Sequence, residues 1–344
     1  MTNNEAAWIK HDKAYPLEVG PAPFPEAGPG EVVLKNQVIA LNPVEWNIQA
    51  NNFFIKDFPF ILGADAAGYV EEVGEGVTHV QKGQRVMGYC MGLGVNKPSY
   101  GAFQRYPTLF ASLVSPIPDS ITLEQAAVLP LAITTAATSM YHQDHLALPL
   151  PQLGVPRTHE TAKTILIWGG ASSVGSVAIQ LAVASGLDII TTASKHNHEF
   201  VQSLGAAQVF DYKSATVVDE IVAALSGKNL VGVYDCISEP ESMEPLGAIL
   251  DRTGPSKVCF IVPPKINLSK NIQWTMSLAF EIMNDKGKPV LDHVWGKFVP
   301  KAIVNKQLRP KPDPVVVGNG LEDIQAGMDK QKAGVSAKKL VIRL

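Results

Sequence analysis

The stretch from residue 164 to residue 187 constrains the fold most, because its hydrophobic period changes halfway along. It begins with a short, continuously apolar run at residues 164–168, passes through Gly169 and Gly170, and continues as an apolar stripe that Gly186 stops. The stripe has helical spacing and consists of Val174, Val177, Ala178, Leu181 and Ala182. No charge interrupts the stretch, as in a membrane span, but the change of period predicts a buried strand, a tight turn and a helix.

Further apolar runs separated by helix-length segments follow this turn. With the first strand they lie at residues 165–168, 188–193, 208–210, 230–235 and 258–262. Such alternation is typical of a doubly wound parallel sheet. The sequence therefore predicts an α/β domain over residues 122–291, entered through a helix-rich segment at 122–140 and an exposed, proline-rich connection at 142–161.

The two ends of the chain have a different pattern, with short strand-like stretches between glycines and prolines. Before residue 122 these stretches lie at 31–40, 67–73, 84–88 and 101–106. Near the C-terminus they lie at 314–317 and 339–344, on either side of a helix near 321–330. Residues 1–121 and 292–344 are therefore predicted to form one β-rich domain, into which the α/β domain is inserted.

Composition excludes several classes of function. Of 344 residues, 46% are hydrophobic, so a sizeable core can form, and 29 basic residues against 32 acidic ones give a net charge of −3. Without a basic run, neither a nucleic acid nor a membrane is expected as a partner. Cys90, Cys236 and Cys259 lack the paired spacing of a disulfide framework or a zinc site. The first residues lack the pattern of a secretory signal, which favours a cytoplasmic location.

The turn after the first strand of the α/β domain has the spacing G-x-S-x-x-G, formed by Gly170, Ser172 and Gly175. In dinucleotide-binding folds such a turn lets backbone approach a pyrophosphate, which the N-terminus of the next helix then binds. The candidate pyrophosphate residues are Gly170, Ala171, Ser172, Ser173, Val174 and Gly175. The alternative is a tight turn that binds no ligand.

The end of the second strand indicates which nicotinamide cofactor binds. An acid is normal there in NAD-binding domains, but this chain has Ser194, Lys195 and Asn197, with no acid before Glu199. A lysine beside hydroxyl and amide donors suits the 2′-phosphate of NADPH, because charge-assisted hydrogen bonds to phosphate are strong. A solvated loop lysine is the alternative interpretation of Lys195.

Motifs in both predicted domains resemble those of the medium-chain dehydrogenase/reductases, the superfamily of alcohol dehydrogenases and quinone reductases. They are ILGADAAGYVEEVG at residues 61–74, GQRV at 83–86, LNP at 41–43, EQAAVLP at 124–130, TTA at 134–136 and GVSAKKLV at 334–341. This resemblance implies a GroES-like catalytic domain formed by both chain ends and a Rossmann cofactor domain between them.

Departures from the family pattern imply that the chain holds no metal. Ala64 stands where zinc-holding members have a histidine, and the ligand cysteines expected around residues 42–45 and near Leu131 are absent. Catalytic zinc needs three protein ligands and structural zinc needs four. Two close pairs of histidines are interpreted as surface residues rather than ligands. These pairs are His142 with His145 and His196 with His198.

Within the zinc-free branch, the chain looks most like the fungal trans-acting enoyl reductases that serve polyketide synthases, on residues 148–151, 193–197 and 209–212. The resemblance implies NADPH-dependent reduction of an α,β-unsaturated acyl chain held on a synthase carrier, by a monomer or homodimer. Two other hypotheses stay open. One is a stand-alone NADPH-dependent reductase of enones or quinones, and the other is a non-catalytic NADPH-binding module.

The resemblance also assigns roles. Asn42 and Thr135 match positions that line the nicotinamide, and Tyr212 matches a tyrosine beside the adenosine phosphate. Buried turn residues, and for Tyr212 a core aromatic, are the alternatives. Asn47 stands where polyketide relatives often have a lysine, so the candidate catalytic residues are Asn42, Asn47 and Thr135.

The proton donor stays open. Phe53 and Phe54 occupy the place of a tyrosine in mitochondrial-type enoyl reductases, and neither can donate a proton. Water, Thr135 and Tyr100 are the candidates. Asp65 is interpreted as a hydrogen-bonded structural carboxylate rather than as a buried acid with a shifted pKa.

Overall fold

The computed structural model describes residues 3–154 and 163–344. It has two compact units, unit 1 formed by Met1–Leu131 with Pro310–Leu344, and unit 2 formed by Ala132–Arg309. The sequence placed the corresponding borders after residues 121 and 291, ten and eighteen residues earlier. Part of the expected connection, residues 155–162, lies outside the described residues.

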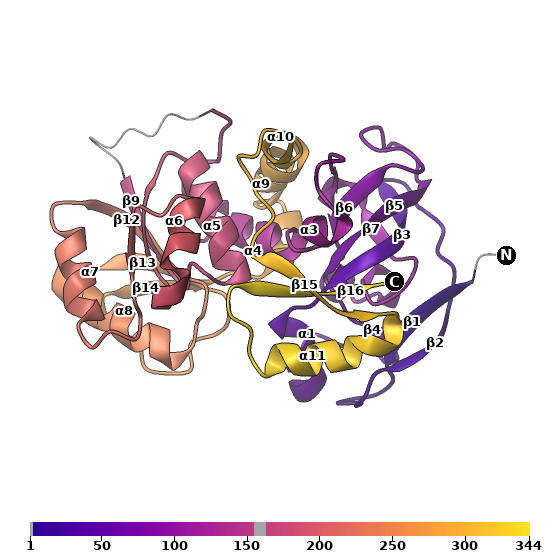
Figure 1. The fold of residues 1–344 in the computed structure, drawn as a ribbon, viewed down its shortest axis with the longest axis horizontal. Coiled ribbons are helices and arrows are strands. Elements are labelled where there is room, and N and C mark those ends of the chain that lie inside the picture. Colours follow the sequence, from indigo (N-terminus) through magenta and orange to yellow (C-terminus); the bar gives the residue numbers. More distant parts are fainter. Residues whose placement is uncertain (1–2, 155–162) are drawn as a thin grey trace. The chain divides into compact units, whose positions relative to one another are not determined.

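Unit 1 is rich in β-structure (Figure 1). Within its described residues, seven strands form a sheet in the order β15-β16-β3-β5-β6-β8, with β7 also paired to β3, and a three-stranded sheet has the order β2-β1-β4. The strands are β1 Asn4–Ile9, β2 Glu18–Ala22, β3 Glu31–Ala40, β4 Phe60–Ile61, β5 Asp65–Val73, β6 Arg85–Tyr89, β7 Thr108–Phe110, β8 Val114–Pro116, β15 Asp313–Asn319 and β16 Lys338–Arg343. The helices are α1 Pro43–Asn51, α2 Gly92–Val95, α3 Leu123–Ala127 and α11 Ile324–Lys332.

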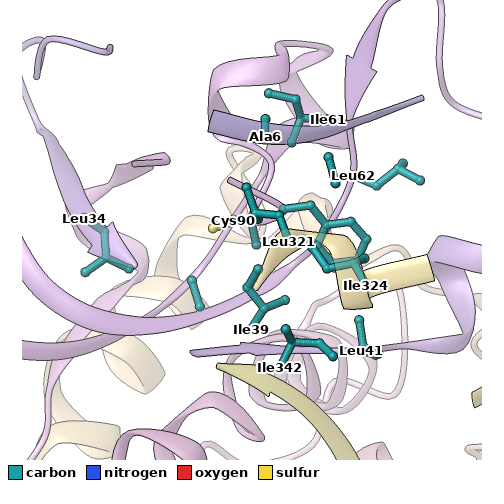
Figure 2. Close-up of a cluster of buried hydrophobic side chains, with 14 of the residues drawn as sticks. Ala6, Leu34, Ile39, Leu41, Ile61, Leu62, Cys90, Leu321, Ile324 and Ile342 are labelled. Atoms are coloured by element: carbon teal, nitrogen blue, oxygen red, sulfur yellow. The ribbon is translucent and has the colours of Figure 1, made fainter. Parts of the chain in front are cut away.

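The core of unit 1 combines residues from both parts of its chain. Ala6, Leu34 and Ile39 from the first part pack in one cluster with Ile324 and Ile342 from the second (Figure 2). All five side chains are buried. Apolar burial is the main favourable term in folding, so this cluster explains why segments so far apart in sequence form one unit.

The expected strand at residues 101–106 is wrong. The structure has only an isolated bridge there, between Gln104 and Ala6. The Gln104 side-chain amide donates to the carbonyls of Pro98, Ser99 and Gly101, at 3.1, 3.1 and 2.7 Å. These bonds fix a series of turns, so the segment does not form a ladder.

Unit 2 contains a parallel sheet whose strand order in the described residues is β11-β10-β9-β12-β13-β14 (Figure 1). Numbered along this unit, the order is 3-2-1-4-5-6, that of dinucleotide-binding folds, with the switch point between β9 and β12. The strands are β9 Lys163–Trp168, β10 Asp188–Thr192, β11 Gln208–Phe210, β12 Asn229–Asp235, β13 Ser256–Phe260 and β14 Ile272–Met276. The first five match the predicted apolar runs to within two residues.

Unit 2 also contains helices. They are α5 Ser173–Ala184, α6 His198–Leu204, α7 Val217–Leu225, α8 Pro240–Thr253, α9 Lys288–His293 and α10 Val299–Val304, and α4 Pro130–Tyr141 begins at the border of the units. Ile221 of α7 and Leu246 of α8 pack against Leu166 and Val233 of the sheet. Among the described residues, no helix combines the length and apolarity needed to cross a membrane.

Candidate functional site

The turn between β9 and α5 is anchored to the neighbouring strand. The Gly169 N–H donates to Thr192 Oγ1 at 3.0 Å, and the Gly170 N–H donates to the Thr192 carbonyl at 2.9 Å. Gly169 has a φ of +83°, which favours glycine. The turn therefore lies at the carboxyl ends of β9 and β10, next to the switch point, where ligands bind in doubly wound sheets.

The turn is packed tightly on one side and open on the other. Gly170 and Gly175 are buried, and a Cβ on Gly175 would lie 2.2 Å from the Gly169 carbonyl oxygen. The four residues between them are half-buried, so solvent reaches the first turn of α5. They are Ala171, Ser172, Ser173 and Val174. This combination of an exposed helix N-terminus and glycine-only packing fits a phosphate group.

Ser172 replaces the usual central glycine of the motif because it caps the helix. Its Oγ accepts a hydrogen bond from the Gly175 N–H at 3.0 Å, and its backbone is extended, with φ −69° and ψ 166°. Serine is among the preferred N-cap residues. The hydroxyl is therefore used inside the turn.

We expect Ser172→Ala to lower the free energy of unfolding by about 1 kcal/mol and Ser172→Gly by a few tenths, because glycine tolerates the N-cap position and alanine does not. Urea unfolding of the two variants measures this difference. Equal losses would show that the hydroxyl does not cap α5.

The ends of β10 and β11 bring together residues predicted to bind the 2′-phosphate. Ser194 Oγ donates to the Tyr212 hydroxyl at 3.3 Å, and the Asn197 N–H donates to the Ser194 carbonyl at 2.8 Å in a short helix, Lys195–Asn197. Lys195 is exposed, and Tyr212 is 42% exposed. Tyr212 is therefore not a core aromatic, and the hydroxyl and ammonium donors of this edge suit a phosphate.

Asn42 lies in a buried polar cluster of unit 1. Its side-chain NH₂ donates to Asp65 Oδ2 at 2.9 Å and to Glu45 Oε1 at 3.1 Å, and its Oδ1 accepts from Lys339. The Glu45 carboxylate also accepts from the Asn42 backbone N–H at 2.5 Å. Both ends of the Asn42 amide are therefore engaged by neighbours in its own unit.

The ionic partners in this cluster are Asp65 and Lys339, with Oδ2 and Nζ 3.1 Å apart. Their side chains are 0% and 4% exposed. Asp65 Oδ1 accepts from the Leu131 N–H at 2.6 Å, so Asp65 is a hydrogen-bonded carboxylate. Burial raises the pKa of Glu45 to about 8, against the lowering effect of its hydrogen bond with Asn42.

The other catalytic candidates on helices are Asn47 and Thr135. Asn47, on α1, is half-buried, and its Oδ1 accepts from Asn51 Nδ2 at 2.6 Å. Thr135 is half-buried on α4 in unit 2, where its carbonyl accepts from the Ser139 hydroxyl at 2.8 Å. The Tyr100 hydroxyl donates to Glu31, and burial together with this bond raises the pKa of Tyr100, which makes it a weaker proton donor.

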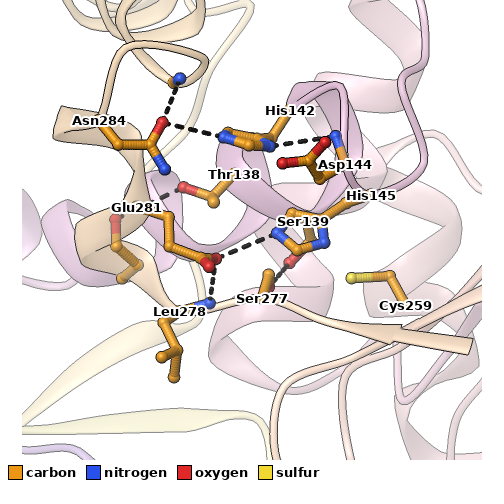
Figure 3. A network of polar contacts seen from close by, with 12 residues as sticks. Thr138, Ser139, His142, Asp144, His145, Cys259, Ser277, Leu278, Glu281 and Asn284 are labelled. Atoms are coloured by element: carbon orange, nitrogen blue, oxygen red, sulfur yellow. Dashed lines mark hydrogen bonds and ion pairs between the residues drawn. The ribbon is translucent and has the colours of Figure 1, made fainter.

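The prediction that His142 and His145 are surface residues is wrong. Only 2% and 5% of these residues are exposed, and both belong to a polar network in unit 2 (Figure 3). His142 Nε2 lies 3.2 Å from Asn284 Oδ1, and His145 Nε2 lies 3.1 Å from Glu281 Oε2. A partner far along the chain contacts Nε2 of each ring, so the local loop-like sequence did not show their burial. His196 is exposed and His198 half-buried.

The residues at the expected zinc positions do not fit a zinc ion. Ala64 offers a methyl group, and the Asn42 amide is bonded on both sides. Across residues 3–154 and 163–344, no three histidine, cysteine or acidic side chains form a group that could hold a metal. Structural and catalytic zinc sites are built from such groups.

Sequence reasoning missed two members of the buried cluster, Glu45 and Lys339. The available signal for Lys339 was its place directly before the apolar run of β16. The three residues that follow it are all buried. Sequence reasoning also gave no role to Lys213, whose ammonium lies beside the Tyr212 ring.

Comparisons with known proteins agree with this architecture. Residues 28–119 match the alcohol dehydrogenase GroES-like domain family, and residues 173–283 match the zinc-binding dehydrogenase family. The chain belongs to the medium-chain dehydrogenase/reductases, and its fold combines a GroES-like domain with a Rossmann-like parallel-sheet domain. It is therefore an oxidoreductase of that family.

Among its relatives is the trans-enoyl reductase himH of Aspergillus japonicus, which is 42% identical over 99% of this chain and 97% of the relative. The solved structure of an alcohol dehydrogenase superfamily protein from Novosphingobium aromaticivorans has a TM-score of 0.79 and 23% identity, over 99% of each chain. That of the CurK enoyl reductase has a TM-score of 0.74 and 18% identity, over 98% of this chain and 99% of the other. These two likenesses concern the fold.

Proposed function

We propose that the protein is an NADPH-dependent, zinc-independent enoyl reductase that reduces the activated C=C bond of an α,β-unsaturated acyl thioester. Its substrate would be a polyketide intermediate held on the carrier domain of a synthase, on which it acts in trans. The observation that carries this proposal is the 42% identity, over nearly the full length of both chains, with a protein named as a trans-enoyl reductase. The geometry of unit 2 supports the cofactor.

The cofactor would bind along the carboxyl edge of β9, β10 and β11. Gly170 and Gly175, with the residues between them, would take the pyrophosphate at the N-terminus of α5. Ser194, Lys195, Asn197 and Tyr212 would take the 2′-phosphate, since the Ser194 and Tyr212 hydroxyls already lie 3.3 Å apart. An NAD-type site would require a carboxylate at this place, and residues 194–197 contain none.

The nicotinamide, when bound, supplies a hydride for the β-carbon of a conjugated thioester. The residues of the chain have to orient the acyl group and stabilise the oxygen that gains negative charge. Thr135 has a hydroxyl that suits this task. Asn42 has its amide fixed by Asp65 and Lys339, so we assign it the role of holding its segment in place. Asn47 stays a candidate for orienting the substrate, and the proton comes from water or Thr135.

The decisive experiment is stopped-flow oxidation of NADPH with one acyl group presented in three ways. These are a crotonyl group on an excised carrier domain, the same group on a short free thioester, and a free enone. We expect turnover with the carrier-bound group to be fastest and unchanged by EDTA. Turnover with free enones or quinones alone would identify a stand-alone reductase, and binding of NADPH without any turnover would identify a non-catalytic module. Loss of activity with EDTA would contradict zinc independence.

A further inference from the structure

We propose that Lys213 is a second cation for the 2′-phosphate of the cofactor and sets the preference for NADPH over NADH together with Lys195. The inference rests on the proposed function and deepens it. It assigns cofactor specificity to Lys213, which lies just beyond β11. This residue is outside residues 194–197, which indicated the 2′-phosphate site.

The first observation is the position of the Lys213 ammonium. Its Nζ lies 5.7 Å from the centroid of the Tyr212 ring, within the range of a cation–π contact. The hydroxyl on that ring is the one that Ser194 contacts from the end of β10. The ring therefore links the ammonium of Lys213 to the pair of hydroxyls assigned to the 2′-phosphate.

The second observation is a turn directly after β11, which fixes the backbone at Lys213. The Lys213 N–H donates to Asp211 Oδ1 at 3.0 Å, and the Ser214 N–H donates to the Asp211 carbonyl at 2.9 Å. The Asp211 carboxylate thus bonds its own backbone. Asp219 pairs with Arg252 at 2.5 Å, and Glu220 accepts from the Ser214 and Thr216 hydroxyls at 3.0 and 2.5 Å. These contacts occupy the carboxylates nearest to Lys213 in sequence.

The third observation concerns charge. In the described part of the chain, neither Lys195 nor Lys213 takes part in a salt bridge, and both are exposed. Two such ammonium groups follow adjacent parallel strands, β10 and β11. A 2′-phosphate carries up to two negative charges, whereas the 2′-hydroxyl of NADH carries none, so a second cation here discriminates between the cofactors.

The test measures dissociation constants for NADPH and NADH by nicotinamide fluorescence in Lys213→Ala, Lys213→Arg, Lys195→Ala and a matched control, Lys301→Ala. Lys301 is another exposed lysine of unit 2, on α10. We expect Lys213→Ala to weaken NADPH binding about fivefold, as for an exposed ion pair near the upper end of its range, and to change NADH binding less than twofold. Lys213→Arg should keep the preference, and Lys301→Ala should change neither constant.

Salt and small probes complete the experiment. Raising the ionic strength should weaken NADPH binding less in Lys213→Ala than in the unaltered protein. The variant lacks the attraction between Lys213 and the phosphate, which salt screens in the unaltered protein. Adenosine 2′,5′-bisphosphate should displace NADPH from the unaltered protein more strongly than inorganic phosphate does, and Lys213→Ala should reduce that difference. Equal competition by inorganic phosphate would overturn the assignment to a nucleotide.

The two proposals fail in different ways. If the unaltered protein prefers NADPH and Lys213→Ala keeps that preference in full, the role of Lys213 is refuted and the enoyl reductase proposal stands. If the unaltered protein binds NADH as tightly as NADPH, the cofactor part of the proposed function fails first. Equal weakening of both cofactors by Lys213→Ala would also refute a role in specificity.

Discussion

Replacing Lys339 with methionine is expected to lower the free energy of unfolding of unit 1 by about 3–5 kcal/mol. The variant keeps most of the buried volume of the lysine stem but removes the ammonium that lies 3.1 Å from Asp65. The buried Asp65 carboxyl would then lose its cation and keep the Asn42 amide and the Leu131 N–H as hydrogen-bond donors. Removal of one partner of a buried pair costs more than the pair contributes, because the remaining charge stays desolvated.

Thermal and urea unfolding measure this loss, and the preceding residue supplies a matched control. Lys338 has a half-exposed side chain that pairs with Asp313 at 3.5 Å. An exposed pair contributes about 0–1 kcal/mol, so Lys338→Met should unfold nearly like the unaltered protein. Similar losses in both variants would show that the buried ion pair has no special role.

A double variant separates the pair from its surroundings. Asp65→Asn removes the charge that Lys339→Met leaves unpaired, so the two changes together should cost less than the sum of the single losses. Residues in direct contact typically show such coupling, of about 0.5–3 kcal/mol. Strictly additive losses would mean that Asp65 and Lys339 stabilise the unit independently.

Gly175→Ala should destabilise unit 2 by about 3 kcal/mol, although alanine is the better helix former. Its Cβ would lie 2.2 Å from the Gly169 carbonyl oxygen and 2.9 Å from Gly170 Cα. Both atoms are backbone, so α5 has to move away from its strand.

Gly296→Ala is the control for this prediction. No atom lies within 4 Å of a Cβ built there, and Gly296 is exposed within a helical turn. This change should leave stability unaltered or raise it by up to about 1 kcal/mol, because alanine restricts the unfolded chain. Calorimetry of both variants gives the comparison, and a stable Gly175→Ala protein would contradict the close packing of α5 on β9.

Local patterns in the sequence were sufficient for most of the fold. The strands Glu31–Ala40 and Gln208–Phe210 have the predicted bounds, because turn residues bound the strand-like runs at both places. The strand Ile272–Met276 was missed, since the polar residues Gln273 and Thr275 interrupt its apolar residues and Trp274 is 51% exposed. Such a strand lacks the continuous apolar run of a fully buried one.

The candidate site was predictable only in part, for a physical reason. The glycine turn and Ser194 with Tyr212 follow from spacing within short segments. The partners of Asn42 do not, because the bond from Lys339 joins residues 297 positions apart. The burial of His145 likewise depends on Glu281, which is 136 positions away. Such pairs form only when the tertiary structure brings distant segments together.

The core of unit 1, which combines the first and last parts of the chain, has a consequence for biosynthesis. A ribosome makes the chain from the N-terminus, and domains generally fold as units while synthesis proceeds. Unit 2 is complete once Arg309 has emerged. The sheet of unit 1 then still lacks β16, whose residues 341–343 pair with residues 38–40 of β3. Unit 2 therefore has its whole chain available for folding first, and the edge of β3 that β16 covers stays unpaired until β16 has left the ribosome.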